Sequence, residues 1–451
     1  MEYNSKDITC PYCKRTFKHD GVHFRLSRYE DSRKLDEKMR KLTEEPNPKR
    51  RQQRQRELQR IKKRMRRTGD AKLADHWKKY GFPIPGTGID GEEEYARPAF
   101  EAGDLDLLFH NSRSDSWQLD NTGDGGAFLW RVWDCYGELS AYKLCPHCHN
   151  KLPYYFGQHE VYKIALLGNS DSGKTVYMRV LEREIKNILA KAGLMLNKGW
   201  FIPDNAPHYE EAEGLEDDGD LPEGTRGLKQ PIFLDVRQSL NGGRCATLVI
   251  YDMEGEKFTG DTKEFANYVD SYFDSCDAAI FLMEPGQFPE FANGENTVPV
   301  DDILSKLEGV SKSQKGKIAA VVLSKSDEIV ERIEYGHGTI GDVFQRNDVI
   351  FSPIRDAPVG GFDKKSYGYV RGGMCYLLHE LDKNRVLRNR INNIFGFENV
   401  SYFAVSSLGH RAEVRDNSST KKTAGTIVPR RIEEPFLWVL YKLGLVQGIE
   451  K

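Results

Sequence analysis

The sequence has no hydrophobic run long enough to cross a membrane. No apolar stretch approaches the ~18 residues that span a bilayer, and the N-terminus, "MEYNSKDITCPYC", lacks the basic-then-apolar pattern of a secretory signal. The absence of a span and of a signal indicates a reducing compartment. The 8 cysteines among 451 residues are therefore not expected to form a disulfide framework. The sequence therefore predicts a cytoplasmic protein without a membrane span.

The chain as a whole also lacks an excess of either charge, since its formal net charge is −2. The charges are nevertheless segregated along it. Lys49–Arg67 carries eleven Lys and Arg residues against one Glu, whereas His208–Gly224 is strongly acidic. The basic segment could bind RNA or DNA through phosphates, although it has few aromatic residues for base stacking. A solvated helix, or one docked on the acidic segment, explains the same charges.

One short segment carries a phosphate-binding signature. "GNSDSGKT", residues 168–175, matches the pattern Gly-x-x-x-x-Gly-Lys-Thr. The preceding segment, Val161–Gly168, is apolar and β-prone, and the following one has helical periodicity with a stop signal at Gly193. A strand that ends in a glycine-rich loop before a helix aims backbone N–H groups and the positive helix end at one point. The sequence therefore predicts a nucleotide site.

Within this loop each position has an expected role. The candidate nucleotide-binding residues are Gly168, Asp171, Ser172, Gly173, Lys174 and Thr175. Backbone N–H groups from residue 171 onward would surround the β-phosphate, and Lys174 would reach the β- and γ-phosphate oxygens. Thr175 would hold Mg²⁺ through its hydroxyl group. Asp171 could in addition recruit a monovalent cation, although a turn-forming role is the favoured explanation of an Asp there.

A second phosphate-side motif follows in Arg244–Glu256, "RCATLVIYDMEGE", where an apolar strand is expected to deliver Asp252. Asp252 would contact Mg²⁺, and the N–H of Gly255 could approach a γ-phosphate because no side chain intervenes. Glu256 stands where Ras-like proteins carry a water-orienting Gln. It could accept a hydrogen bond from water, but its charge would face a phosphate. Intrinsic hydrolysis that is slow, or that needs another group, is therefore expected.

Two later segments contain candidate residues for binding the base of the nucleotide. Lys317–Ile329 ends in Ser324, Lys325 and Asp327, where the carboxylate of Asp327 could accept two hydrogen bonds from guanine while the Lys325 stem lies along the base. Adenine offers no such donor pair, so it would leave Asp327 underpaired at a cost of a few kcal/mol. Further on, Ser406 and Ser407 follow a β-prone segment. A backbone N–H near Ser407 could meet guanine O6.

These four motifs occur in one order, each after a predicted strand, and would meet in the crevice of an open α/β sheet. The chain thus resembles the translation-factor-related class of P-loop GTPases over roughly residues 160–448, and in particular the double-GTPase families of bacterial conflict systems. The features that carry this resemblance are "GNSDSGKT", "YDMEGE", "SKSD", the acidic insert ending "LPEGTRGLKQP" and the tail "VPRRIEEPFLWVLYKLG". It implies a Ras-like α/β fold, GTP or GDP with Mg²⁺, and a regulatory role in antiviral or signalling systems.

A γ-phosphate sensor is expected before the second strand of such a domain. That strand is expected in Gln230–Leu240, which makes Thr225 the candidate. Thr225 could ligate Mg²⁺ only in the triphosphate state and so order its loop. A plain loop residue explains Thr225 equally, because loops favour Thr.

Two Cys-Pro-x-Cys segments predict a metal site. They supply Cys10 and Cys13 from "CPYC" and Cys145 and Cys148 from "CPHC". Two such pairs complete a tetrahedral Zn²⁺ site, which a soft cation suits. The two pairs are separated by 131 intervening residues, so we expect a zinc ribbon split by an insertion. Two separate sites, or metal-free thiols, are the alternatives.

The chain is expected to contain an N-terminal module, residues 1–157, and a GTPase domain with a mostly parallel sheet, residues 158–451. The split zinc ribbon of the first would carry a basic helical insertion at about 30–80 and a β-rich part at about 99–140. The predicted function is a GTP-hydrolysing switch that acts on a protein partner, with oligomers possible. The alternatives are a GTP-dependent interaction module without turnover and a nucleic-acid-binding adaptor.

Overall fold

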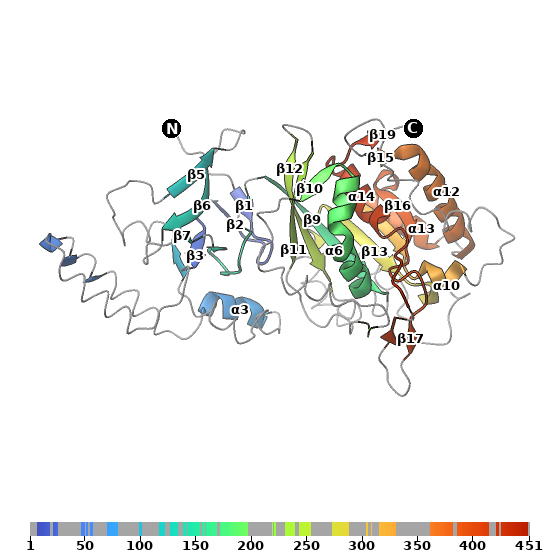
Figure 1. The fold of residues 1–451 in the computed structure, drawn as a ribbon, viewed down its shortest axis with the longest axis horizontal. Coiled ribbons are helices and arrows are strands. Elements are labelled where there is room, and N and C mark those ends of the chain that lie inside the picture. The colour runs from blue at the N-terminus through green and yellow to red at the C-terminus, as the bar shows by residue number, and fades with distance from the viewer. Residues whose placement is uncertain are drawn as a thin grey trace. The chain divides into compact units, whose positions relative to one another are not determined.

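The computed structural model divides the chain into two compact units, residues 1–160 and 161–451 (Figure 1). It describes residues 7–18, 21–25, 47–49, 51–52, 55–56, 70–79, 99–101, 117–121, 127–133, 139–140, 142–153, 156–157, 159–168, 172–196, 219, 221, 231–239, 243–253, 273–287, 304, 308, 315–330, 361–381, 386–414, 421–423 and 425–449. Within these ranges every helix is too short or too polar to cross a bilayer.

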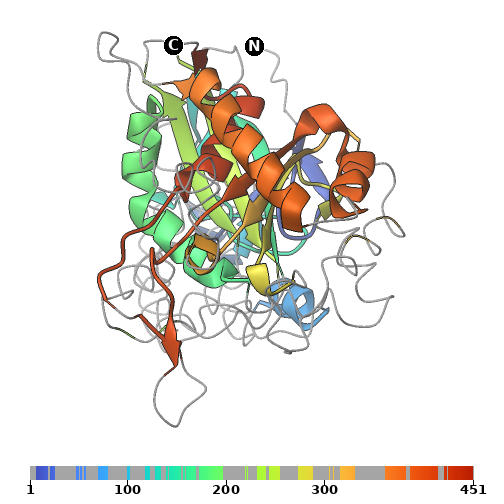
Figure 2. The same ribbon diagram turned by 90° about the vertical axis from the view of Figure 1, so that its right-hand side faces the viewer.

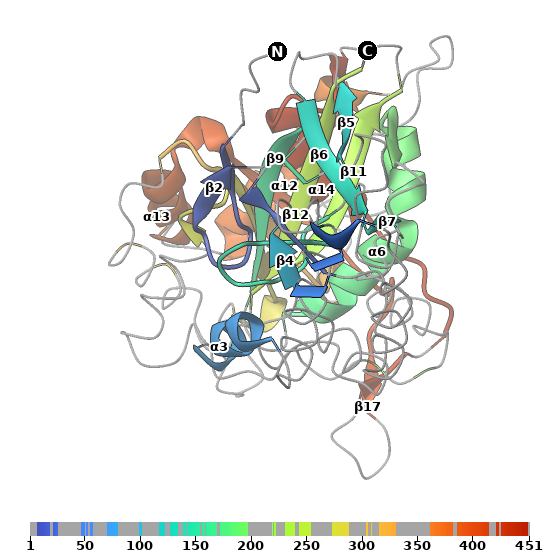
Figure 3. The same cartoon turned by 90° about the vertical axis from the view of Figure 1, so that its left-hand side faces the viewer.

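In its described residues, the N-terminal unit contains short antiparallel strands and helix α3 (Ala71–Lys79), with further helical positions at 48–49, 51–52 and 55–56 (Figure 3). Its strands are β1 (Asp7–Thr9), β2 (Thr16–Lys18), β3 (His23–Arg25), β4 (Ala99–Glu101), β5 (Trp117–Asn121), β6 (Ala127–Trp133), β7 (Leu139–Ser140) and β8 (Lys143–Leu144). They form the pair β1-β2 and two three-stranded sheets, β4-β3-β8 and β5-β6-β7. Helix α3 buries Leu73, His76 and Trp77, a spacing that lies on one helical face.

The C-terminal unit contains a seven-stranded sheet in the order β10-β11-β12-β9-β13-β14-β16. Its strands are β9 (Glu160–Gly168), β10 (Leu194–Leu196), β11 (Ile232–Gln238), β12 (Cys245–Asp252), β13 (Ala278–Met283), β14 (Ile318–Leu323) and β16 (Val400–Ala404). Strands β9, β13, β14 and β16 run parallel, while β11 is antiparallel to both β10 and β12. Every residue of β13 and β14 is buried, as expected for central parallel strands. The predicted α/β class is confirmed.

Helices cover both faces of this sheet (Figures 1 and 2). They include α6 (Lys174–Lys191), α12 (Lys364–Leu381), α13 (Val386–Phe395) and α14 (Glu433–Lys442). Phe281 of β13 contacts Phe395 of α13 with ring centroids 5.5 Å apart, whereas Phe403 of β16 lies 5.7 Å from Trp438 of α14. In the strand register Phe281 shares a face with Tyr402 rather than with Phe403. Helices α13 and α14 therefore pack on opposite faces.

The remaining elements are short. They are η7 (Pro285–Gln287), α10 (Ser326–Val330), β15 (Phe362–Asp363), η8 (Phe397–Asn399), β17 (Glu413–Val414), β18 (Lys421–Lys422) and β19 (Gly448–Ile449). Strands β17 and β18 form a hairpin that projects from the sheet (Figure 2). After this hairpin, the N–H and hydroxyl of Thr423 both donate to the carbonyl of Gly219, at 2.9 and 3.2 Å. This contact ties the hairpin to the acidic segment.

Candidate nucleotide site and metal centre

The parallel strands bring the predicted nucleotide motifs to one edge of the sheet. Leu282 of β13 is in register with Gly168 of β9, and Met283 is in register with Leu323 of β14. Leu323 in turn pairs with Ala404 of β16. Because parallel strands end together, the residues that follow them share this edge, where open α/β sheets bind ligands.

The phosphate-loop glycines have positions that other residues would not fit. A Cβ added at Gly168 would lie 2.5 Å from Oγ of Ser172 and 3.0 Å from the carbonyl oxygen of Leu282. Gly173 has φ of +74°, the left-handed conformation that favours glycine, and is the N-cap of α6. Gly168 is thus required for space and Gly173 for its backbone conformation.

The start of α6 is suited to an anion. Gly173 provides no side-chain cap, and the first helical turn contains no acidic residue. Oγ of Ser172 is buried and has no hydrogen-bond partner in the part of the chain that the structure describes. The N–H groups at the start of the helix and the Ser172 hydroxyl group can donate hydrogen bonds to a phosphate group. The positive end of the helix dipole favours its negative charge.

Lys174 and Asp252 form a buried ion pair at this edge. The ammonium Nζ at the start of α6 lies 3.4 Å from Oδ1 of Asp252, which ends β12, and each side chain is 6% exposed. The ammonium group also donates to the carbonyl oxygen of Met253. A buried ion pair is costly to desolvate and contributes little net stability. Its location between two predicted phosphate-side motifs therefore favours a function in ligand binding.

The base-side lysine reaches across to the phosphate loop. Lys325 follows β14 with φ of +50°, and its Nζ donates to Oε2 of Glu284 at 2.7 Å. A Cβ built at Gly173 would lie 3.8 Å from Cε of Lys325, which is van der Waals contact. Gly173 of the phosphate loop and Lys325 of the base-side motif, more than 140 residues apart in the sequence, are thus adjacent in the fold.

Two of the other base-side candidates are open to a ligand. Asp327, on α10, is half-buried, and its carboxylate has no partner among the residues described. Ser407 is also half-buried, and its N–H makes no backbone hydrogen bond within the described ranges. Ser406 differs, because its N–H donates to the carbonyl of Arg430 and its Oγ accepts from the N–H of Gly409. Ser406 therefore shapes the loop, and Ser324 similarly donates its hydroxyl to the carbonyl of Met283.

Other sequence-predicted residues are only partly described. Thr175 is half-buried in the first turn of α6. Asp171, Thr225, Gly255 and Glu256 lie outside the described residues, as does most of the basic segment Lys49–Arg67. The candidate switch and water-orienting residues thus stay predictions.

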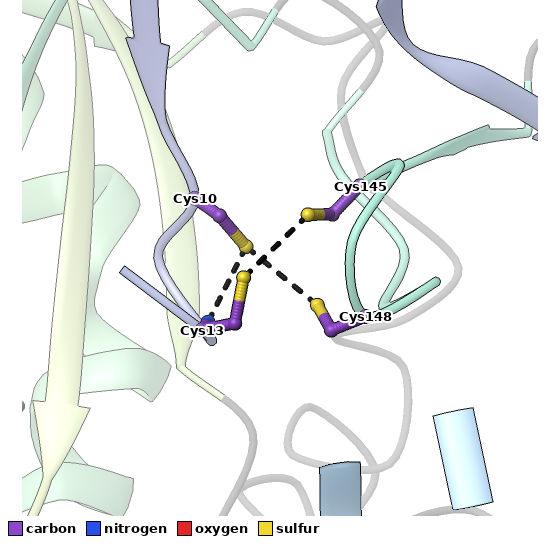
Figure 4. Close-up of side chains that lie close together, drawn as sticks. All are labelled: Cys10, Cys13, Cys145 and Cys148. Atoms are coloured by element: carbon purple, nitrogen blue, oxygen red, sulfur yellow. Dashed lines mark hydrogen bonds between the residues drawn. The ribbon is translucent and has the colours of Figure 1, made fainter. Parts of the chain in front are cut away.

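The four predicted metal ligands converge on one point (Figure 4). Their sulfur atoms all lie within 4.8 Å of one another, with Cys10 to Cys148 at 3.8 Å and Cys13 to Cys145 at 3.7 Å. A tetrahedral zinc ion with Zn–S bonds of about 2.3 Å requires sulfur atoms about 3.8 Å apart. The spacing of the cluster therefore fits Zn²⁺, and one joint site is favoured over two separate ones.

The two cysteine pairs lie on loops of the same construction. In the first, the N–H of Lys14 donates to the Cys10 carbonyl at 3.1 Å, and Lys14 has φ of +60°. In the second, the N–H of His149 donates to the Cys145 carbonyl at 2.9 Å, and His149 has φ of +54°. Backbone N–H groups also point at the first sulfur of each turn, two at Cys10 and one at Cys145, at 3.4–3.5 Å. These donors favour thiolates.

The protonation of the cluster depends on a cation. Burial raises the pKa of the Cys10 thiol, whereas a hydrogen bond from Cys10 lowers the pKa of Cys13. A metal-free cluster would thus mix thiols with thiolates, because four negative charges this close together, three of them buried, repel one another strongly. A divalent cation would offset that repulsion and allow all four cysteines to ionise.

Apart from His149, which is expected beside the metal ligands or at the surface, sequence reasoning missed the groups around the metal centre. His149 is buried, with Nδ1 2.8 Å from Oδ2 of Asp70 and Nε2 3.0 Å from Nδ1 of His23. Asp70 caps α3 by accepting from the N–H of Leu73 at 3.3 Å. Burial lowers the pKa of His23 to about 4, which keeps that ring neutral. These contacts hold α3 against the second cysteine pair, and only the acidic residue before a helical pattern could have indicated them.

Comparisons with known proteins give distant similarities. No protein-family model matches the chain. It is 22% identical, over 335 residues, to SaeC of Mycolicibacterium smegmatis (strain ATCC 700084 / mc(2)155), which has a provisional description as an ESX-1 scaffolding and assembly protein. This alignment covers 68% of the present chain and 82% of SaeC.

Two solved GTPase structures are weakly similar to the chain. The GTPase-like domain of S. cerevisiae Ski7, bound to GTP, aligns with 65% of this chain and 52% of its own at 13% identity and a TM-score of 0.29. The small GTPase Arl6 (BBS3) of Trypanosoma brucei aligns with 63% and 98%, at 10% identity and a TM-score of 0.26. The chain thus spans about half of the Ski7 chain. Similarity at these scores establishes neither a shared fold nor a shared function.

Proposed function

We propose that the C-terminal unit binds a guanine nucleotide with Mg²⁺ and acts as a GTP-hydrolysing regulatory switch. The supporting observation is the meeting of three motifs at one sheet edge. Lys174 lies 3.4 Å from Asp252, and the stem of Lys325 lies over Gly173. These contacts place three groups close to the phosphate loop: the Lys174 cation for a phosphate, the Asp252 carboxylate for a metal and the Lys325 stem for a base.

The residues present suit Mg²⁺, which prefers oxygen ligands. Thr175 would contribute its hydroxyl and Asp252 its carboxylate, directly or through water. When bound, the cation would neutralise charge on the β- and γ-phosphates. Guanine would be selected by Asp327, whose carboxylate is half-buried and has no protein partner within the described ranges. Thr225 and Glu256 are proposed to sense the γ-phosphate and to orient water.

In the N-terminal unit we propose a structural Zn²⁺ site formed by the four cysteines. The sulfur separations of 3.7 and 3.8 Å support this proposal, as does the closed ligand set, which has no position for a reacting water. The metal would then join the two ends of the long insertion. The resemblance of the sequence to conflict-system GTPases supports a role of the whole chain in bacterial antiviral or signalling systems.

A second candidate function is nucleotide-dependent scaffolding without useful turnover. It is favoured by the similarity to SaeC over 82% of that protein, which is described as a scaffolding and assembly protein. Such a module would bind GTP and recruit a protein partner or a second copy of the chain. The chemistry of the two candidates differs only in the hydrolysis step.

Phosphate release under multiple turnover separates these functions. A switch should release several phosphates per protein from GTP with Mg²⁺, and Lys174→Ala should abolish the release. Binding of GTP without release would favour the scaffold. Binding of RNA that weakens steeply with salt, and that is lost on deletion of residues 49–67, would instead favour a nucleic-acid adaptor.

A further inference from the structure

Glu284 pairs with the lysine that forms one side of the candidate base site. Its Oε2 accepts a 2.7 Å hydrogen bond from Nζ of Lys325. The Glu284 side chain is 9% exposed and that of Lys325 is 27% exposed, so the pair is largely shielded from water. A charge-assisted hydrogen bond in such surroundings restricts a side chain more strongly than one at the surface.

The backbone on both sides of this pair is also restrained. The carbonyl of Met283, next to Glu284, accepts hydrogen bonds from the N–H and the hydroxyl of Ser324, at 2.8 and 3.0 Å. Lys325 has φ of +50°, a conformation that costs a non-glycine residue free energy and persists only where its surroundings enforce it. The loops after β13 and β14 thus hold the two charged groups together.

The Lys325 stem in turn contacts the phosphate loop. Its Cε would be 3.8 Å, and its Cγ 4.0 Å, from a Cβ placed on Gly173. The stem therefore runs along this glycine, with its ammonium group retained by Glu284 beyond it. A lysine without such a partner is strongly hydrated and flexible, and it would sample many rotamers.

We propose that Glu284 is a positioning residue for nucleotide binding. It holds the apolar stem of Lys325 across Gly173 and so preorganises the surface on which the base packs. This inference rests on the proposed function of the site. Glu284 acts through Lys325 and does not itself contact the nucleotide, so its contribution to affinity disappears when the lysine is removed.

A double-mutant cycle tests the proposal. The affinity for fluorescently labelled GDP is measured for the wild type, Glu284→Ala, Lys325→Met and the double variant. Each single variant should bind about tenfold more weakly, because each releases the same stem from Gly173. The double variant should be no weaker than Lys325→Met, because residues that act as a unit are not additive. Additive losses, or wild-type affinity in Glu284→Ala, would overturn the proposal.

Matched variants separate positioning from folding. Glu284→Gln keeps the shape and an acceptor oxygen and should bind only about threefold more weakly than the wild type, because its hydrogen bond lacks the charge. If Glu284→Ala does not fold, the cycle is run with Glu284→Gln, and its loss must likewise vanish in the Lys325→Met background. Glu308→Ala is the control, because it removes a carboxylate paired with Arg390 at 2.8 Å and should leave GDP affinity unchanged.

The outcomes distinguish this inference from the function on which it rests. If the wild type binds no guanine nucleotide, the proposed function fails and the role of Glu284 fails with it. If the wild type binds GDP and Lys174→Ala does not, while the Glu284 variants bind like the wild type, only the positioning role fails.

Discussion

The indole N–H of Trp77 donates a 3.0 Å hydrogen bond to Oδ1 of Asn150, and the amide of Asn150 donates to Sγ of Cys148 at 3.3 Å. Trp77 lies on α3 and is 1% exposed. The helix of the insertion is therefore linked to the candidate metal centre through Asn150, in addition to the contact between Asp70 and His149. Groups that hydrogen-bond to metal ligands orient them and tune their affinity.

Removing this link should weaken the metal site. Trp77→Phe keeps a large ring but leaves Oδ1 of Asn150 without its donor, so we expect about tenfold weaker zinc binding and a loss of about 1–3 kcal/mol in unfolding free energy. Competition with a chromophoric chelator measures the affinity. Lys78→Ala, an exposed change on the same helix, is the control. Equal zinc affinity in Trp77→Phe and the control would contradict the link.

The freshly purified protein should carry about one zinc ion per chain. Structural zinc supplies about 10–16 kcal/mol of apparent folding free energy in small peptides, so Cys145→Ser should lose the metal and unfold the N-terminal unit first. Metal analysis with limited proteolysis checks both results. Cys375→Ser, in the C-terminal unit, should retain the zinc. Metal-free wild-type protein, prepared without chelators, would refute the site.

The phosphate loop should depend on Lys174. Lys174→Ala removes the cation expected to face the β- and γ-phosphate oxygens, so GTP binding should weaken by about 100-fold or more. Lys191→Ala changes an exposed lysine at the other end of the same helix and should bind like the wild type. Isothermal titration with GTP and Mg²⁺ compares them. An affinity of Lys174→Ala equal to that of the control would defeat the phosphate-loop interpretation.

Asp327 should select guanine over adenine. Asp327→Ala should cost GTP a few kcal/mol and leave the weak binding of ATP almost unchanged. Asp327→Asn presents a donor beside an acceptor, which complements the 2-oxo edge of xanthine, so affinity should fall for GTP and rise for XTP. Competition binding with the three nucleotides measures this. Equal affinity of the wild type for ATP and GTP would contradict the selection of guanine by Asp327. The protein would then be a P-loop NTPase without a guanine preference.

A buried carboxyl group should make stability depend on pH. Burial raises the pKa of Asp235, on β11, to about 6 from its ordinary 3.8, and one of its oxygens accepts from Thr247. The folded protein thus binds this proton more tightly than the unfolded chain does. The contribution of Asp235 to stability is greatest below about pH 4 and falls by about 3 kcal/mol as the pH rises through about 6.

Asp235→Asn should remove that dependence because an amide does not titrate. Urea midpoints of the two proteins are compared between pH 4 and pH 7. The difference should shift in favour of the variant as the pH rises. A difference that stays constant across this range would show that Asp235 titrates normally in the folded protein.

Local patterns predict the strands that carry motifs. The apolar segment Val161–Gly168 corresponds to β9, and Lys317–Ile329 contains β14, because a buried parallel strand is a short apolar run between turn signals. The helix after the phosphate loop ends near Gly193, which has φ of +77°. Such features depend on neighbours in the sequence and can be read from it.

Contacts between distant segments escape this reasoning. Strand β13 carries no recognisable motif, so neither its place beside β9 nor Glu284 at its end is predicted from the sequence. The bond from Glu284 to Lys325 joins residues 41 apart, and that from Trp77 to Asn150 joins residues 73 apart. Their pairing depends on strand order and on how the insertion packs, which no local pattern encodes.

The separation of the two cysteine pairs has a consequence for biosynthesis. Cys13 and Cys145 are separated by 131 intervening residues, and at roughly 5–20 residues per second the ribosome needs roughly 7–26 s to make this part of the chain. Bringing the ends of such a loop together costs about 4 kcal/mol in chain entropy, which structural zinc can offset. The four-cysteine site of the N-terminal unit can therefore form only after Cys145 and Cys148 have been translated. Until then, the thiols of Cys10 and Cys13 are exposed to oxidants and competing metals.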